Sequence, residues 1–395
     1  MKSRETNTKD KLLFTPGPLT TSATVKQAML HDAGSWHFDF AERVHWIRNQ
    51  LLAVAELSQA AGWEAVLLQG SGTNGVESVF ATCVPPGGKV CVLANGAYGE
   101  RMTQMLRLLQ IPFSVLRSNE NELPDLALLE RTLSTDPSFT HVAAVHCETT
   151  TGLVNPIAQI GAVAHRHACQ FILDAMSSFG GVPINFESAG IDFLVSSANK
   201  CLEGVPGVCF VLGRREAFLA NEKHARSLSL NLADQLRGFE RNGQFRFTPP
   251  THVLLALEQA LREFWAEGGV PARHRRYQLN HAVLVEGMQR LGFQPYLPPS
   301  LQSCLITAFH YPTGPQFQFP EFYRRLSDQG FIIYPGKLSA AETFRIGNIG
   351  HLFEVDIRAL LKAIGDVQHE LGFGSEPDHP PAETIGGLHA IPLIL

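Results

Sequence analysis

Between about residue 64 and residue 212, the chain repeats one pattern: a short apolar run, a loop of small residues and a helical stretch. The apolar runs are continuous rather than alternating, so each predicted strand is buried on both faces. Strands of this kind, joined by amphipathic helices, are typical of an α/β fold with a mainly parallel sheet covered by helices. The predicted strands of this seven-stranded sheet are 64–68, 89–93, 113–116, 141–146, 170–173, 193–195 and 208–212.

Beyond this region the pattern changes to that of a smaller α+β unit, which a helix predicted over 251–268 would connect to the first. The elements predicted there are helices over 273–291, 319–329 and 354–371 and strands over 304–309, 331–333 and 343–346. We therefore expect four segments: an N-terminal segment (1–21) packed with the small domain, a large domain (22–268), a small C-terminal α+β domain (269–373) and a flexible tail (374–395).

The net charge, the cysteines and the apolar segments limit which partners and which cellular compartment we expect for this protein. Lys and Arg number 32 and Asp and Glu 37, a net charge of −5, which offers no phosphate-tracking surface for nucleic acid. The seven cysteines form no Cys-x-x-Cys pair and most lie within apolar runs, which indicates buried free thiols in a reducing compartment. Residues 1–11 lack a signal peptide's apolar segment, and no apolar run approaches the roughly 20 residues that span a bilayer. We expect a cytoplasmic protein without a membrane or metal partner.

A glycine-rich loop, Gly70-Ser71-Gly72-Thr73-Asn74-Gly75, joins the first predicted strand to a helix. Glycines permit close backbone approach, and the free N–H groups at a helix start attract an anion. The string also matches a dinucleotide loop, but that interpretation needs an acid at the end of the next strand, where Asn95-Gly96 stands instead. A simple tight turn and a phosphate site both remain compatible with the loop alone.

Two charged residues follow other predicted strands. Asp174 ends the run Phe171-Ile172-Leu173, and Lys200 ends Ser196-Ser197-Ala198-Asn199. Alone, Asp174 could equally cap a helix, and Lys200 could be an ordinary solvated lysine. Together with the glycine-rich loop they supply the three things that pyridoxal phosphate needs: an anion cradle, a carboxylate for the pyridine nitrogen and a lysine for the Schiff base. Lys200, once displaced by the substrate amine, would then move a proton between substrate and cofactor carbons.

From about residue 13 to residue 373, the chain resembles the class V aminotransferases of fold type I, which bind pyridoxal phosphate (PLP). The segments that carry the resemblance are 13–20 (Leu-Phe-Thr-Pro-Gly-Pro-Leu-Thr), 69–74, 95–101 (Asn-Gly-Ala-Tyr-Gly-Glu-Arg), 146–152, 196–200, 245–251 and 344–347. Within the class, the resemblance implies transfer of the amino group of 2-aminoethylphosphonate to pyruvate, giving phosphonoacetaldehyde and L-alanine.

The resemblance also implies roles for individual residues. Tyr98 would stack on the cofactor ring, and Thr149 would lie at the polar edge of the ring near Asp174. Thr248 would reach the phosphate of the neighbouring subunit, which makes the active unit a homodimer. The residues expected to face the phosphate are Ser71, Gly72, Thr73 and Asn199. Without the resemblance, Tyr98 would be interpreted as a core aromatic and Thr248 as a turn residue.

Arg345 lies on the short apolar run Phe344-Arg345-Ile346 of the C-terminal unit. Its planar guanidinium suits a carboxylate or a phosphonate, although on sequence alone it could be a surface charge. In the family the matching arginine holds the substrate carboxylate. Because a transaminase runs two half-reactions through one site, we expect Arg345 to serve both pyruvate and the phosphonate of the amine donor.

The chain departs from the family pattern at His37, where an acid is expected near the substrate entrance, and after residue 373. The nearest alternative function is an alanine–glyoxylate or serine–pyruvate type transaminase, which shares every cofactor residue. A cysteine desulfurase would need a cysteine on a mobile loop, and Cys304 begins an apolar run instead. An NAD oxidoreductase lacks its ribose acid, and a PLP-binding regulator lacks a DNA-binding module or basic patch.

Overall fold

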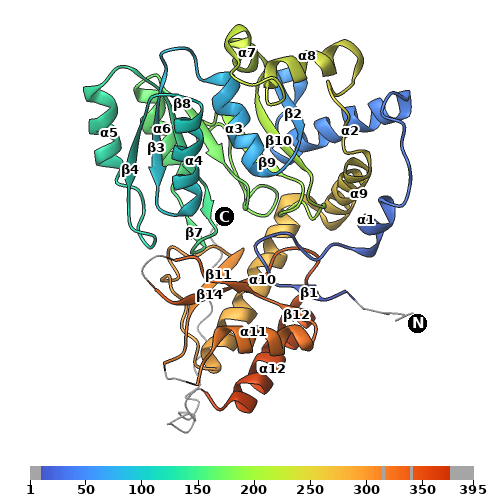
Figure 1. The fold of residues 1–395 in the computed structure, drawn as a ribbon, viewed down its shortest axis with the longest axis vertical. Coiled ribbons are helices and arrows are strands. Elements are labelled where there is room, and N and C mark those ends of the chain that lie inside the picture. Colours follow the sequence, from blue (N-terminus) through green and yellow to red (C-terminus); the bar gives the residue numbers. More distant parts are fainter. Residues whose placement is uncertain (1–9, 314–315, 339–340, 374–395) are drawn as a thin grey trace, which may run out of the picture.

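The computed structural model describes residues 10–313, 316–338 and 341–373 (Figure 1). Residues 63–214 contain the strands of a seven-stranded sheet. The strand order is β2-β10-β9-β8-β5-β3-β4, and β10 alone runs antiparallel to its neighbours. The strands are β2 (Trp63–Gln69), β3 (Lys89–Ala94), β4 (Phe113–Arg117), β5 (Phe139–Val145), β8 (Gln170–Asp174), β9 (Phe193–Ser197) and β10 (Val208–Arg214). All seven predicted runs are strands of this sheet, so the mainly parallel α/β prediction is confirmed.

The burial of these strands explains their unbroken apolar sequences. Every residue of β9 is buried, and so is nearly every residue of β5, β8 and β10, which means that both faces of the sheet are covered. Only β4, at one edge, is half exposed along its length. The sheet and its helices share one large apolar core.

Helices follow most of the strands and pack on the sheet: α3 against β9 and β10, α4 against β3, and α6 against β5 and β8. At Gly75 in α3, a Cβ would lie 2.6 Å from a methyl of Val195, so this glycine permits the close helix–strand contact. The helices of the large unit are α1 (Ala23–Ala28), α2 (Phe38–Val54), α3 (Gly72–Cys83), α4 (Ala97–Leu108), α5 (Leu126–Thr135), α6 (Ile157–Arg166), α7 (Arg215–Leu219), α8 (Leu232–Asn242) and α9 (Thr251–Glu267). Two 3-10 turns (Gln59–Ala61, Glu222–His224) and the small hairpin β6 (Cys147–Glu148) and β7 (Leu153–Val154) complete it.

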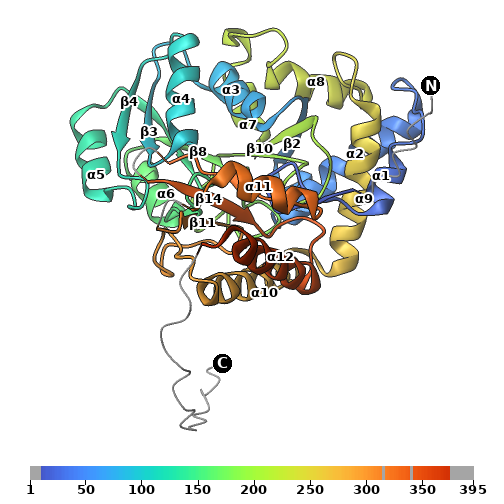
Figure 2. The ribbon, with the colours of Figure 1, turned by 60° about the horizontal axis from the view of Figure 1, so that its bottom comes forward.

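The smaller unit has its own sheet, in the order β11-β14-β13, and its own apolar core (Figure 2). Its elements are α10 (Gly269–Arg290), β11 (Ile306–His310), α11 (Phe319–Asp328), β12 (Phe331–Ile332), β13 (Tyr334–Pro335), β14 (Thr343–Gly347) and α12 (Glu354–Leu371). Two predicted starts in this unit differ, whereas several predicted ends differ by a single residue: α10 begins four residues earlier than 273, and the strand predicted at 304–309 begins at Ile306. The first difference arises because Gly268 and Gly269 both adopt positive φ, which turns the chain from α9 into α10 without a loop.

Residues 10–22 run along the boundary between the two units (Figure 1). The short strand β1 (Leu12–Leu13) pairs in parallel with β12, and Phe14 is fully buried in the core of the smaller unit. The division at residues 21, 268 and 373 stays a prediction, and the predicted tail at 374–395 lies outside the described residues.

The seven cysteines are all free, and six of them are buried, as the spacing predicted. None of the helices in the described part of the chain is long and apolar enough to cross a membrane. Within residues 10–313, 316–338 and 341–373, no group of three His, Cys, Asp or Glu side chains is arranged to hold a metal ion.

Candidate active site

A cavity of about 180 Å³ opens at the edge of the sheet where β2, β8 and β9 end. Because the carboxyl ends of parallel strands meet at one edge, residues far apart in the sequence come together there. The predicted site residues that line the cavity are Ser71, Gly72, Thr73, Tyr98, Asp174, Asn199 and Lys200. The glycine-rich loop, the carboxylate and the lysine thus share one cavity.

The helix start at α3 forms one wall of this cavity. The Oδ1 atom of Asn74 accepts hydrogen bonds from the Ser71 N–H (2.9 Å) and the Ser71 hydroxyl (3.0 Å), which fixes the turn into the helix. A Cβ on Gly72 would lie 2.1 Å from the end of the Met176 side chain, so a larger residue here would displace the thioether that lines the cavity. The amides that follow are oriented as in an anion-binding helix N-terminus.

Asp174 ends β8 and is almost completely buried, with 6% of its surface exposed. Within the described chain, the one hydrogen bond to its carboxylate comes from the Met176 N–H, at 2.9 Å. Burial raises the pKa of Asp174 to about 6, and the neighbouring Glu148 adds to the effect. The site therefore holds a carboxylate that a cationic partner would stabilise strongly.

Lys200 follows β9, and its Nζ donates a hydrogen bond to the Pro16 carbonyl from the N-terminal segment. Burial lowers the pKa of Lys200 to about 8, although the negative charge of Asp174 acts in the opposite direction. Gly17 has φ +119°, and a Cβ there would lie 2.7 Å from the Lys200 Nζ. The N-terminal segment is therefore a wall of the site, placed directly on the lysine.

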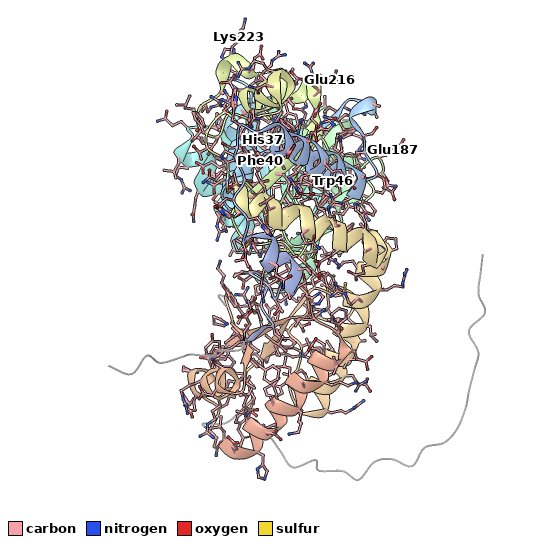
Figure 3. All side chains as sticks on the ribbon, turned by 90° about the vertical axis from the view of Figure 1, so that its right-hand side faces the viewer. His37, Phe40, Trp46, Glu187, Glu216 and Lys223 are labelled. Atoms are coloured by element: carbon pink, nitrogen blue, oxygen red, sulfur yellow. The ribbon has the colours of Figure 1, made fainter. Side chains whose placement is uncertain are left out.

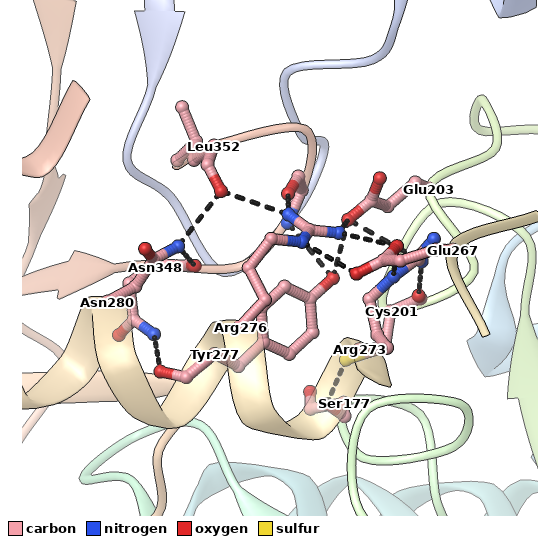
Figure 4. Close-up of polar contacts among 11 residues, drawn as sticks. Ser177, Cys201, Glu203, Glu267, Arg273, Arg276, Tyr277, Asn280, Asn348 and Leu352 are labelled. Atoms are coloured by element: carbon pink, nitrogen blue, oxygen red, sulfur yellow. Dashed lines mark hydrogen bonds and ion pairs between the residues drawn. The ribbon is translucent and has the colours of Figure 1, made fainter. Parts of the chain in front are cut away.

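A buried polar network holds the loop after the lysine (Figure 4). Arg273 donates to the Cys201 carbonyl (2.5 Å), and Glu203 accepts from Arg276 Nη2 (2.7 Å). Arg276 Nη1 also donates to the Leu352 carbonyl (3.0 Å), which lies a few residues beyond β14. The network therefore connects the lysine loop of the large unit to the smaller unit through α10.

Three predicted site residues do not line this cavity. Arg345 and Thr149 are both buried, and Arg345 Nη1 donates to the Thr149 carbonyl at 2.7 Å, so the two lie together. Thr248 lines a separate hollow with Gly70 and Asn74. Their predicted roles toward substrate, ring and partner subunit stay predictions.

His37, at which the sequence departs from the family pattern, lies at the start of α2, in the upper part of Figure 3. His37 caps this helix by accepting from the Asp39 N–H (3.4 Å), and it lines a shallow hollow with Arg43. No residue of 34–40 lines the cavity of Lys200 within this chain. The predicted place of this segment at a substrate entrance stays a prediction.

Several cavity residues were not predicted from the sequence. Arg101, Met105 and Met176 line the cavity, and Pro16 and Gly17 touch Lys200. A signal existed for Arg101, because it lies three residues after Tyr98 and therefore on the same helix face. The contact with Pro16 had no local signal.

This fold, with a lysine, a carboxylate and a helix N-terminus in one cavity, belongs to a known class of enzyme. The chain is a member of the class V aminotransferases: the model described as "Aminotransferase class-V" matches residues 24–321. It is 52% identical, over 89% of its length and 96% of the relative's, to the 2-aminoethylphosphonate–pyruvate transaminase of Salmonella typhimurium strain LT2. Aminotransferases of this class are typically pyridoxal-phosphate-dependent.

Solved structures agree on the fold. Pyridoxamine–pyruvate aminotransferase from Mesorhizobium loti superposes with a TM-score of 0.83 at 24% identity, over 92% of this chain and 94% of that one. Ureidoglycine–glyoxylate aminotransferase from Bacillus subtilis superposes with a TM-score of 0.86 at 21% identity, over 95% and 97%. At these identities the likeness establishes the shared fold alone.

Proposed function

We propose that this chain is a pyridoxal-phosphate-dependent transaminase that moves the amino group of 2-aminoethylphosphonate to pyruvate, forming phosphonoacetaldehyde and L-alanine. The observation that carries the proposal is the 52% identity, over 89% of the chain, to a transaminase named for those two substrates. The cavity supports it, because the lysine, the carboxylate and the helix N-terminus that pyridoxal-phosphate chemistry needs lie around one space.

The residues of the cavity fit the cofactor. Ser71, Gly72 and Thr73 would hold its phosphate at the start of α3, together with Asn199, and Tyr98 would stack on its ring. Bound pyridoxal phosphate supplies an aldehyde for the amine and a ring that withdraws electrons from the substrate carbon. The fit is supported by Asp174, a buried carboxylate without a cationic partner in the described chain.

Asp174 and Lys200 would then have distinct roles in the reaction. Asp174 would be ionised by a protonated ring nitrogen beside it, because the opposite charge lowers its raised pKa. Lys200 donates to the Pro16 carbonyl, and its lowered pKa gives it a larger neutral fraction near neutrality than an ordinary lysine has, so that it can take up a proton. Gly17 keeps the lysine's space free of a side chain.

The rate of cofactor capture should follow the ionisation of Lys200. Only the neutral amine attacks an aldehyde, and the pKa of Lys200 is about 8 rather than the ordinary 10.5. Reconstitution of the cofactor-free protein, followed by visible absorbance, should therefore accelerate as the pH rises and level off above about pH 8. A rate that keeps rising toward pH 10.5 would show that the lysine is not buried as described.

Arg345 is the proposed anchor for the substrate anion. Its Nε and Nη1 donate to the Pro335 and Thr149 carbonyls (3.0 and 2.7 Å), which leaves Nη2 without a hydrogen bond within the described chain. Arg345→Ala should lower kcat/KM for both substrates on the order of 10²-fold, the scale of losing a buried charge partner, while cofactor binding persists. The effect is measured by following the half-reaction with each substrate separately. If kcat/KM falls with pyruvate alone, the phosphonate binds at a site other than Arg345.

We further propose a cytoplasmic homodimer in which Thr248 reaches the partner's cofactor phosphate. The separation of Thr248 from the chain's own cavity supports this arrangement. Sedimentation of the holoenzyme would test the dimer, and Thr248→Val should weaken cofactor retention if the contact exists.

The substrate assignment is tested with the purified holoenzyme and no keto acid. The visible spectrum is recorded before and after adding 2-aminoethylphosphonate, and in parallel after adding L-serine. Conversion to the pyridoxamine form by the phosphonate alone supports the proposal. Conversion by serine alone would retain the transaminase class and replace the substrate with that of the serine–pyruvate type. No cofactor band even after adding pyridoxal phosphate would overturn the proposal entirely.

A further inference from the structure

Three cationic side chains gather around Tyr98, which lines the cavity. The guanidinium carbon of Arg101 lies 4.9 Å from the centre of the Tyr98 ring, and the Nζ of Lys337 lies 5.1 Å from it. Arg345 is close enough to Lys337 for the two positive charges to interact. Arg101 belongs to the large unit, whereas Lys337 and Arg345 belong to the smaller one.

None of these three cations forms an ion pair with a carboxylate within the described chain. Arg101 donates to the Thr73 hydroxyl (3.3 Å), and Arg345 donates to two backbone carbonyls. The nearby carboxylate of Glu148 is fully buried and accepts from the Thr150 hydroxyl (2.5 Å) and the Tyr98 N–H (3.3 Å). The region therefore keeps an excess of positive charge beside the cavity.

The excess positive charge also acts on the pKa of Lys337. Partial burial lowers its pKa, and the charges of Arg101 and Arg345 lower it further. Repulsion of this kind is relieved when an anion binds, so the cluster is organised to gain more from a doubly charged ligand than from a singly charged one.

The backbone holds Lys337 in this position. Tyr334 of β13 pairs with Arg345 of β14, so Lys337 lies in the connection between two strands that also carry the arginine. At Gly336 a Cβ would lie 2.0 Å from the Thr343 carbonyl oxygen, so the chain passes tightly against β14 just before the lysine. Lys337 makes no hydrogen bond within the described residues, and its ammonium donors remain available.

We propose that Lys337 is a specificity-determining residue that binds the phosphonate group in addition to Arg345. The inference rests on the proposed function. A carboxylate presents one charge and two oxygens, which the free face of Arg345 can satisfy. A phosphonate presents a third oxygen and a second charge, and Lys337 supplies the additional cation as a compact point charge. Arg101 is directed instead to Thr73, at the helix start proposed for the cofactor phosphate.

The proposal is tested by equilibrium binding, so that it does not depend on turnover. Calorimetric titrations of the holoenzyme use ethylphosphonate and propionate, which carry the two anions but no reactive group. The variants are Lys337→Met, which removes the charge, Lys337→Arg, which keeps it, and Lys362→Met as a control at an exposed lysine paired with Asp366. Because Lys337 is exposed, its substitution should leave the fold and the cofactor band intact.

Lys337→Met should weaken ethylphosphonate binding about tenfold, a change of about 1.4 kcal/mol, and propionate binding less than twofold. Lys337→Arg should restore most of the phosphonate affinity, and Lys362→Met should change neither ligand. Equal losses for both ligands, or no loss for either, would overturn the proposal. If Lys337 supports phosphonate binding but the enzyme does not convert 2-aminoethylphosphonate, the proposed function fails and this inference stands. If the enzyme converts 2-aminoethylphosphonate but Lys337→Met does not change phosphonate binding, this inference fails and the proposed function stands.

Discussion

Lys200→Ala is expected to lower kcat on the order of 10⁴-fold, the upper end of what one positioned proton carrier contributes. The side chain is an amine that lines the cavity, donates to the Pro16 carbonyl and has a pKa of about 8. Arg345, whose charge acts on that of Lys200, cannot replace it, because a guanidinium does not lose its proton near neutrality. The measurement is the single-turnover rate with 2-aminoethylphosphonate, followed by the loss of the cofactor band.

Two controls separate a chemical effect from a structural one. Lys26→Ala removes an exposed lysine that pairs with Asp10 and should leave the rate unchanged. Added methylamine should restore part of the rate of Lys200→Ala, because a small amine can enter the space that the side chain leaves. A variant that keeps more than a tenth of the wild-type rate would contradict the role assigned to Lys200.

Asp174→Asn is expected to lower kcat on the order of 10²–10³-fold, the scale for losing one preorganised electrostatic group. The substitution keeps the size of the side chain and an oxygen that can accept from the Met176 N–H (2.9 Å), but it removes the negative charge that is proposed to pair with the ring nitrogen. The rate of the first half-reaction measures the effect. Asp136→Asn, at an exposed carboxylate paired with Lys89, is the matched control.

The same variant should make the cofactor-free protein more stable. The pKa of Asp174 is about 6 in the folded chain against an ordinary 3.8, so the folded chain binds more protons than the unfolded one between these values. The stability that this carboxyl contributes is therefore present at low pH and is lost as the pH rises through 6. Above pH 6, thermal unfolding of Asp174→Asn should show a gain on the order of 1–3 kcal/mol; a lower melting temperature would show that the charge is already paired.

Most of the large unit was predictable because its signals are local. Each buried strand of a parallel sheet is a short apolar run, and each run was recognisable without knowledge of its neighbours. Asp174 and Lys200 were predictable for the same reason, since a polar residue at the end of such a run comes to the common edge of the sheet. The junction at Gly268 and Gly269 shows the limit, because two glycines replaced the loop that usually separates helices.

Pro16, Gly17 and Lys337, which were not predicted as site residues, reach the site through contacts that no local pattern encodes. Pro16 reaches Lys200 across a sequence separation of 184 residues, and its position depends on the packing of β1 against β12. Lys337 sits beside Tyr98 only because the smaller unit lies against the large one. The strings that contain Pro16, Gly17 and Arg101 were visible in the sequence, but their proximity to the lysine was a product of the tertiary fold.

The position of the N-terminal segment also sets an order of events during synthesis. Residues 10–22 leave the ribosome long before β12, yet β1 has no strand partner until β12 has been translated. A nascent chain that ends before Phe331 could carry Asp174 and Lys200 on their strands, but the segment that contains Pro16 and Gly17 would lack the pairing of β1 with β12. We therefore expect the contact of Lys200 with Pro16 and Gly17 to reach its final form only after Phe331 and Ile332 have been translated.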